Sequence, residues 1–291
     1  MKDLHGRHAF ITGGASGIGL AIAEAFVNEG MTVTIVDIRK DHIETALAEF
    51  KRRGQSDSVE AVVLDVADRE AFTRAVNTEF ARHKRVDILV NNAGVGIAGP
   101  IAETTFDDWD FGIGANLYGA VNGLTLFLPR MIAQGGGGHI VNVSSLSGIT
   151  PAARNSAIYA TTKAGLVGLT ESIRDELADH DIGVSVLMPG PFKTNIREVK
   201  NYRPERYRAH SGYAKEEEKL AQRVDDPSWA DPRDAAKMVV DAIRGNSLYI
   251  ITHGDFKGWA EGRFEEILAA FPWCDPERLA ALGKRRPAKK E

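Results

Sequence analysis

Tyr159 and Lys163 have residue types and a spacing suited to proton transfer. On an α-helix, residues four apart lie on the same face, so a helix here would place a phenol beside an ammonium. A phenol ordinarily loses its proton near pH ~10, and a neighbouring cation lowers that pKa by favouring the phenolate. Such tuning is what general acid–base catalysis near neutral pH requires. Because an ordinary helix surface also produces this spacing, the meaning of the pair depends on the elements that position it.

The composition indicates one large α/β domain. The chain has 291 residues, of which 43% are hydrophobic and 26% charged, enough for a substantial core. Its formal net charge of −4 excludes a global basic field that would recruit nucleic acid. The single cysteine, Cys274, excludes a disulfide framework or a multi-cysteine metal site, so we expect no metal and a cytoplasmic location. The N-terminus does not resemble a signal peptide, and no apolar run approaches the ~20 residues of a membrane span.

A glycine-rich turn near the N-terminus predicts a dinucleotide site. It follows a short apolar strand pattern at 8–12 and precedes a helical pattern that extends to Gly30. Glycines allow the backbone to approach a pyrophosphate, and the helix N-terminus offers it free N–H groups and a positive dipole end. A tight strand–helix turn without a ligand is the alternative. The residues that we expect to contact the cofactor here are Gly13, Ser16, Gly17, Ile18 and Gly19.

Acidic residues end the next two predicted strands. Asp37 follows strand 31–36, about twenty residues past the glycines, where a dinucleotide-binding unit places the acid that binds the adenosine ribose. A carboxylate there repels a 2′-phosphate, so NAD is favoured over NADP, although Arg39 could pair with such a phosphate or simply be solvated. Asp65, with Val66, follows strand 59–64. Asp65 could accept a hydrogen bond from an adenine amine or cap the next helix.

The alternation of strands and helices predicts a parallel sheet with helices on both faces. The further strands are expected at 86–90, 139–143, 184–188 and 248–252. Because the carboxyl ends of parallel strands share one edge, ligands bind there. Asn92 and Gly94 follow the fourth strand, where a structural role and a cofactor contact are both possible. Asn116 stands within a helical pattern, either on the surface or as an interior polar contact.

These motifs together resemble the short-chain dehydrogenase/reductase family, of its ordinary single-domain type. The resemblance covers about residues 4–251. It is carried by Thr12-Gly13-Gly14-Ala15-Ser16-Gly17-Ile18-Gly19, Asn91-Asn92-Ala93-Gly94, Asn116, Ser145, Tyr159-x-x-x-Lys163 and Pro189-Gly190. It implies a single Rossmann-type, doubly wound parallel sheet of about seven strands and hydride transfer between a nicotinamide and an alcohol or carbonyl.

The resemblance also implies roles for matched positions. Tyr159 is similar to the family's acid/base, Lys163 to the residue that lowers its pKa and binds the nicotinamide ribose, and Ser145 to the residue that holds the substrate oxygen. Asn116 matches the family's anchor of a water in the proton relay. The loop from Ser145 to Tyr159 is one residue longer than is usual, so Ser144 and Ser147 are alternative positions for the serine. Further cofactor contacts are implied at Pro189, Gly190, Phe192 and Thr194.

Two segments depart from the alternation. Segment 195–226 is rich in charge and carries Tyr202, Tyr207 and Tyr213, and we expect it to be a substrate lid on the 1–252 catalytic domain. Solvated surface helices are the alternative. Residues 253–283 predict a helical extension that packs against the body or a second subunit, and 284–291 a disordered basic tail. Trp109 and Phe111 could face an aryl substrate or fill core.

Three stretches are similar to those of a narrower branch, the bacterial Cα-dehydrogenases that oxidise the benzylic alcohol of lignin β-aryl ethers with NAD. They are residues 37–42, 104–110 and 202–207. The resulting hypothesis is an NAD-dependent oxidoreductase of a bulky aromatic secondary alcohol, with a homo-oligomer (dimer or tetramer) implied by the family. The alternatives are an NADPH-dependent carbonyl reductase, with Arg39 on the phosphate, and a cofactor-binding protein without catalysis.

Overall fold

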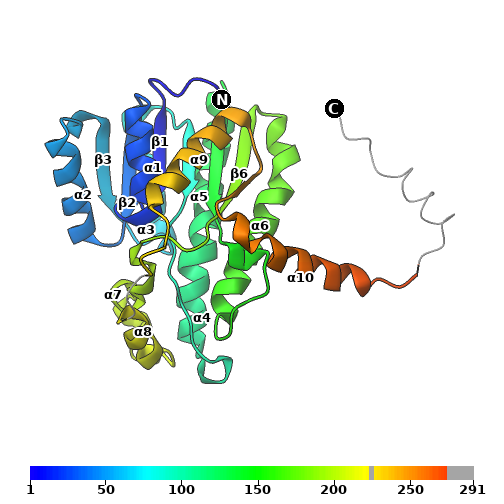
Figure 1. The fold of residues 1–291 in the computed structure, drawn as a ribbon. Helices are drawn as coiled ribbons and strands as arrows, with labels where there is room; N and C mark the ends of the chain where they lie inside the picture. Colours follow the sequence, from blue (N-terminus) through cyan, green and yellow to red (C-terminus); the bar gives the residue numbers. More distant parts are fainter. Residues whose placement is uncertain (223–225, 274–291) are drawn as a thin grey trace.

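A seven-stranded parallel sheet forms the centre of the protein, as predicted. The computed structural model describes residues 1–222 and 226–273 (Figure 1). The strand order is β3-β2-β1-β4-β5-β6-β7, and every neighbouring pair is parallel. The strands are β1 His8–Thr12, β2 Thr32–Asp37, β3 Val59–Val63, β4 Ile88–Asn91, β5 Gly138–Val143, β6 Ile182–Met188 and β7 Tyr249–Ile251. The order reverses direction between β1 and β4, which is where open α/β sheets bind ligands.

Helices cover both faces of the sheet and bury two apolar cores. On one face lie α1 Gly17–Asn28, α2 Lys40–Arg52 and α9 Pro232–Gly245, packed around the side chains of Ile11, Phe26 and Ile35. On the other face lie α3 Arg69–His83, α5 Gly119–Gln134 and α6 Ala157–Ala178, packed around Phe10 and Phe127. Because the central strands are covered on both sides, their sequences are continuous apolar runs.

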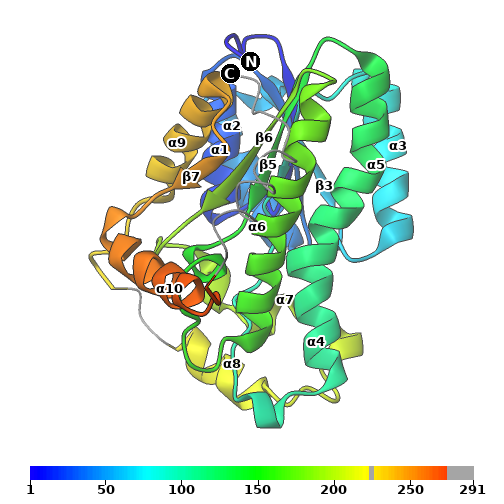
Figure 2. The ribbon, with the colours of Figure 1, turned by 90° about the vertical axis from the view of Figure 1, so that its right-hand side faces the viewer.

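One continuous helical stretch spans residues 106–134. It comprises α4 Phe106–Ile113, a π-helical turn Gly114–Tyr118 and α5. Among the described residues it is the one helix long and apolar enough to cross a membrane, with a mean hydropathy of 1.2. More than half of that window is buried inside the protein. Figure 2 shows the stretch running beside α6, so it is a core helix of this fold.

The segment after β6 forms a small helical layer at the carboxyl edge of the sheet (Figure 1). It contains, in chain order, a 3₁₀ turn Asn195–Arg197, helix α7 Val199–Tyr202, a second 3₁₀ turn Glu205–Tyr207 and helix α8 Ala214–Ala221. The segment predicted to be a lid, 195–226, is helical in parts of 195–221, and residues 223–225 lie outside the described part. Its role as a lid stays a prediction, and the name is kept for this segment below. The further 3₁₀ turns are Ser56–Ser58, Ile101–Glu103, Leu146–Gly148 and Gly254–Phe256.

A buried ion cluster attaches this lid to the body. The Arg203 guanidinium pairs with Glu217 of α8 and lies 3.0 Å from Asp108 of α4, and all three residues are at most 2% exposed. Burial alone would raise the pKa of Asp108, but hydrogen bonds from Ser211, Thr105 and Gly212 outweigh it and hold the pKa below its usual value. Tyr213 packs where a side chain at Gly99 would otherwise lie. The lid is thus fixed in place by buried charges rather than resting on the surface.

The C-terminal helix α10, Lys257–Ala269, extends away from the body (Figure 1). Its apolar residues are exposed, Trp259 at 63% and Leu268 at 67%. It touches the body through Arg263, which donates to the Gly148 carbonyl at 3.0 Å. The first alternative for this extension, packing against the body, does not describe α10, and packing on a second subunit stays a prediction. Cys274, residues 274–283 and the predicted tail 284–291 lie outside the described residues.

Candidate active site

A deep cavity opens at the carboxyl edge, between the β1 and β4 strand ends and the lid. The space between its walls, counted out to the open mouth, is about 1100 Å³. Many of the predicted site residues line it together: Gly13, Ser16, Gly17, Ile18, Asp37, Asp65, Val66, Asn92, Gly94, Tyr159, Lys163, Pro189 and Thr194. The parallel sheet explains this convergence, because each residue follows the carboxyl end of a strand or lies in the first turns of a helix.

Tyr159 lies in the first turn of α6 and reaches the cavity wall. Burial raises the pKa of the Tyr159 phenol, and a hydrogen bond from Ser145 acts in the opposite direction. Burial outweighs the hydrogen bond, and the expectation that Lys163 lowers this pKa stays a prediction. The Lys163 ammonium lies 5.6 Å from the centre of the Tyr159 ring, close enough to act on the phenol through the intervening space.

Lys163 is held in place by the end of β5. Its ammonium donates to the Val143 carbonyl at 2.9 Å, and Lys163 as a whole is only 3% exposed. Burial lowers the pKa of Lys163 to about 8. The hydroxyl of Ser144 donates to the backbone carbonyl of Lys163 at 2.6 Å. Ser144 is thus committed to fixing α6 against β5, which leaves Ser145 as the serine at the phenol.

Asn116 lies within the π-helical turn and is 1% exposed. Its side-chain oxygen accepts from the Val95 N–H at 2.6 Å, and its amide donates to the Val95 carbonyl at 3.0 Å and to Thr162 at 3.3 Å. Of the two possibilities left by the sequence, the interior polar contact is correct. Asn116 therefore connects the segment after β4 to α6. Its contact on α6 is Thr162, the residue before Lys163.

The glycine loop is shaped by two close backbone approaches. Gly13 has a φ of +61°, which a residue with a side chain rarely adopts. A Cβ at Gly19 would lie 2.1 Å from the Gly13 carbonyl oxygen. Asn92 pins the same loop, because its amide donates to the carbonyls of Thr12 and Gly13, both at 2.9 Å. The structural role of Asn92 is therefore confirmed, and it leaves the N-terminus of α1 open towards the cavity.

Asp37 ends β2 at the far side of this loop. Its carboxylate accepts from the backbone N–H of Arg39 at 3.0 Å and of Ala15 at 3.4 Å. Burial raises its pKa, and these backbone hydrogen bonds oppose the rise. Arg39 turns to Asp41, with two hydrogen bonds at 2.8 and 2.5 Å, rather than standing free for a phosphate. The acid lines the cavity, and the neighbouring guanidinium is already paired.

The lid contributes two residues to this end of the cavity that sequence reasoning placed elsewhere or missed. Arg206 donates to the Asp65 carboxylate at 2.6 Å, while the other oxygen of Asp65 accepts from Ala67. Tyr202 lies under the Arg39 guanidinium, 5.6 Å from it, and hydrogen-bonds Ser16. Burial first, and the nearby carboxylates second, raise the pKa of Tyr202 to about 12. No local signal reveals these contacts, because Arg206 and Asp65 are 141 residues apart.

Four predicted cofactor residues do not line the cavity: Gly19, Arg39, Gly190 and Phe192. Phe192 is buried, and its ring meets that of His253 edge-on at 5.1 Å between centres. The backbone N–H of Gly190 donates to the side-chain hydroxyl of Thr252 at 3.1 Å. Pro189 and Thr194 do face the cavity. The turn after β6 thus presents its first residue and its last to the site and packs the middle against the C-terminal strand.

The remaining wall is apolar and lies around Tyr159. It is formed by the side chains of Val95, Phe111, Ala115, Ile196 and Tyr207. Phe111 is 4% exposed and packs against Tyr207, with ring centres 6.1 Å apart. Of the aromatic candidates, Phe111 and Tyr207 line the cavity, whereas Trp109 and Tyr213 are part of the packed lid cluster. Such a wall suits a flat, apolar ligand next to the phenol.

The buried ammonium gives a pH-dependent prediction. A lysine whose pKa falls from 10.5 to about 8 destabilises the folded protein by about 3 kcal/mol at pH 7. As pH rises from about 8 to 10.5, the unfolded chain keeps a proton that the native chain has lost, so this penalty disappears. We expect the stability advantage of Lys163→Met over wild type to fall by about 3 kcal/mol between pH 7 and pH 10. Urea unfolding at the two pH values measures it; a constant difference would contradict it.

Comparison with known proteins agrees with this geometry. A family model described as short chain dehydrogenase matches residues 7–205. A "C alpha-dehydrogenase" from Sphingobium sp. (strain NBRC 103272 / SYK-6) is 39% identical over 92% of this chain and 87% of its own length. A short-chain dehydrogenase/reductase from Burkholderia phymatum, solved in complex with NAD, aligns with a TM-score of 0.86 at 28% identity, covering 95% of this chain and 99% of that one. The apo form of LigD from Sphingobium sp. strain SYK-6 aligns with a TM-score of 0.77 at 33% identity, covering 94% and 100%.

Proposed function

The chain belongs to the short-chain dehydrogenase family, oxidoreductases that act on CH–OH groups with NAD(P), and from this premise we propose that it interconverts a bulky aromatic secondary alcohol and its ketone with NAD. The observation that carries the proposal is the position of the Ser145–Tyr159 hydrogen bond beside the apolar wall that contains Phe111. A benzylic alcohol can place its oxygen at the phenol and its ring against that wall.

The chain's own residues have distinct tasks in this reaction. Tyr159 removes the alcohol proton during oxidation and returns it during reduction, and the Ser145 hydroxyl holds the same oxygen. The Lys163 ammonium stabilises the phenolate and the negative charge that develops on the substrate oxygen. Asn116 holds the strand end and a water that relays the proton outward. When bound, the nicotinamide accepts or supplies the hydride.

The cofactor would lie along the strand ends from β2 to β6. The glycine cradle fits a dinucleotide, because a side chain at Gly13 would be strained and one at Gly19 would collide with the loop. The pyrophosphate meets the N-terminus of α1, where no side chain caps the free N–H groups. The residues that we assign to the cofactor are Gly13, Ser16, Gly17, Ile18, Gly19, Asp37, Asp65, Val66, Asn92, Gly94, Tyr159, Lys163, Pro189 and Thr194, with Arg39, Gly190 and Phe192 supporting them from behind.

The substrate class can be tested by comparing matched alcohols. The relative named C alpha-dehydrogenase supports a benzylic Cα alcohol of a lignin-type β-aryl ether as the probe. We expect kcat/KM for this probe, followed as NADH absorbance, to exceed that for an aliphatic secondary alcohol of equal size by at least about tenfold, since an apolar pocket discriminates by roughly 1–3 kcal/mol. A preference for the aliphatic alcohol would overturn the substrate assignment and leave the reaction class intact.

Cofactor choice gives a separate prediction. Because Asp37 repels a 2′-phosphate and Arg39 is held by Asp41, we expect kcat/KM to favour NAD over NADP by about 100-fold. Asp37→Ser should reduce this ratio to below about tenfold, measured with both cofactors at one alcohol concentration. Asp41→Ser is the matched control, because it frees Arg39 but keeps the acid and should retain the preference for NAD. A wild-type preference for NADPH would favour the carbonyl reductase alternative.

Location and assembly are part of the same proposal. We place the protein in the cytoplasm, as a homo-oligomer of two or four chains acting on a small alcohol or ketone, without nucleic acid or membrane as a partner. The exposed apolar side of α10, with Trp259, Phe264 and Leu268, supports an interface between subunits. Light scattering on the purified chain tests the assembly, and a monomer at micromolar concentration would contradict it.

A further inference from the structure

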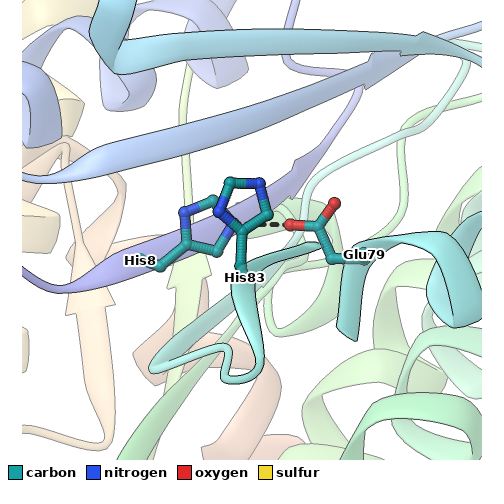
Figure 3. Close-up of side chains that lie close together, drawn as sticks. All are labelled: His8, Glu79 and His83. Atoms are coloured by element: carbon teal, nitrogen blue, oxygen red, sulfur yellow. Dashed lines mark hydrogen bonds and ion pairs between the residues drawn. The ribbon is translucent and has the colours of Figure 1, made fainter. Parts of the chain in front are cut away.

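Two histidines and a glutamate gather at the amino edge of the sheet, opposite the cofactor cavity. His8 is the first residue of β1, while Glu79 and His83 lie in the last turns of α3 (Figure 3). A helix that connects parallel strands runs back across the sheet, so its C-terminus reaches the edge where strands begin. Glu79 and His83 are four residues apart and share one helix face. One ligand atom from each of the three residues lies within 4.8 Å of the other two.

The Glu79 carboxyl group is buried and contacts His8, not a lysine or arginine. It is 4% exposed, and its Oε1 lies 2.5 Å from Nε2 of His8. Within residues 1–222 and 226–273, no lysine or arginine forms an ion pair with it. The neighbouring buried acid Asp87, in contrast, is paired by Arg7 and Arg85 at 2.8 and 2.6 Å. A buried carboxylate is costly unless a positive charge balances it. A cation between Glu79 and the imidazoles of His8 and His83 would supply that charge.

His8 is oriented as a metal-binding imidazole would be. Its Nδ1 lies 2.8 Å from the hydroxyl of Thr32 on the adjacent strand, which fixes the ring and directs Nε2 at Glu79. Ligating histidines ordinarily have such a partner on their second nitrogen. A tetrahedral ion with bonds of about 2 Å would hold the two ligand atoms roughly 3.3 Å apart. Nε2 of His8 and Oε1 of Glu79 therefore need to move apart by less than about 1 Å to bind such an ion.

The interactions of His83 do not prevent its imidazole from binding the same ion as His8 and Glu79. Its ring stacks on that of His8, with centres 3.9 Å apart and planes 12° apart, and its buried Nε2 has no hydrogen-bond partner. Stacked rings do not converge on one ion, so the His83 ring must turn. That turn exchanges a long contact between His83 and the Glu60 carboxylate for the ion, and the side chain is 19% exposed, which gives an entry path. The Glu60 carboxylate, 3.6 Å from His83, and the C-terminal dipole of α3 both favour a cation here.

We propose that His8, Glu79 and His83 bind a divalent transition-metal ion, with Zn²⁺ as the best fit. Two imidazoles and one carboxylate are a donor set that zinc uses with a water as fourth ligand, whereas Mg²⁺ and Ca²⁺ require mostly oxygen. The ion tethers the start of β1 to the end of α3 and neutralises Glu79. It lies at the opposite sheet edge from Tyr159, so its role is structural and the inference does not rest on the proposed function.

Isothermal titration of the full-length, tag-free chain with ZnCl₂, after stripping with chelator, tests the site. We expect one ion per chain with micromolar or tighter affinity, and at 100-fold excess over Kd a rise in Tm of about 5 °C. His83→Ala should weaken binding at least about tenfold, and so should Glu79→Gln, which keeps the shape of the side chain. His180→Ala, an exposed histidine at the end of α6, is the matched control and should bind as wild type does. MgCl₂ should give no comparable heat.

Two results would overturn the proposal. One is zinc affinity that is unchanged by both His83→Ala and Glu79→Gln, since binding would then occur elsewhere. The other is the absence of zinc binding in the folded wild-type chain, because the three side chains would then not form a metal site. Anomalous scattering at the zinc edge in a soaked crystal supplies an independent readout, and a peak between His8 and His83 is expected.

Discussion

Replacing Tyr159 by phenylalanine is expected to lower kcat by about 1000-fold, since general acid–base groups ordinarily contribute about 10²–10⁴-fold. The phenol is the one titratable hydroxyl that both lines the cavity and is hydrogen-bonded to Ser145. Without it, the alcohol proton has no acceptor at the site. Initial rates with saturating NAD and a benzylic alcohol measure the effect.

The control for this variant is Tyr249→Phe. Tyr249 is exposed at 51%, and its hydroxyl donates to Glu171 on the surface, away from the cavity. It should keep wild-type turnover, while Tyr159→Phe should bind NADH as wild type does and unfold at a similar temperature. Turnover above about a tenth of wild type in Tyr159→Phe would contradict the assigned role, because general acid–base catalysis contributes at least about 100-fold. Loss of turnover together with loss of NADH binding would instead indicate a damaged pocket.

Removing Arg203 is expected to release the lid. Arg203→Met would leave Asp108 and Glu217 buried without their shared cation, and breaking a buried pair costs about 3–5 kcal/mol. Because these contacts join the lid to α4 and do not involve the sheet, the loss should appear as local opening. Hydrogen exchange should speed up at least about 100-fold in residues 195–221 and remain unchanged in β1 and β4.

The lid prediction also has a consequence for the cofactor. Tyr202 and Arg206 flank Arg203 and line the adenosine end of the cavity, so Arg203→Met should also weaken NADH binding, read by fluorescence titration. Lys215→Met, an exposed position on α8, is the control and should change neither property. Unchanged exchange in the lid of Arg203→Met would mean that packing, for example of Tyr213 against Gly99, holds it without the charges.

Local sequence patterns were sufficient to predict the sheet and to single out the Tyr159–Lys163 pair. The glycine turn, the apolar strands and the spacing of Tyr159 and Lys163 are each properties of a few consecutive residues. Backbone geometry converts them directly into structure, since a strand buried on both faces must be apolar and residues four apart must share a helix face. The common edge on which they meet follows from the parallel connection alone.

Partnerships between distant segments could not be predicted in this way. The sequence shows charged residues in the lid, but not that Arg203 lies between Asp108 and Glu217 or that Arg206 reaches Asp65. Charged side chains are ordinarily solvated, so their burial depends on where the lid docks. The same holds for the tyrosines: Tyr207 is part of the apolar wall, Tyr202 lines the cavity near Asp37, and Tyr213 lies in the packed interior.

The sequence alone was sufficient to predict the family and its reaction class, because the groups proposed to transfer a proton and cradle a dinucleotide are specified by type and short spacing. Only the tertiary structure decided their electrostatics. Burial raises the pKa of Tyr159 and lowers that of Lys163 to about 8, a result of how much solvent the fold removes rather than of which residues are neighbours. The tertiary structure also brought His8 to Glu79 and His83, whose spacing along the chain gave no sign of a shared site.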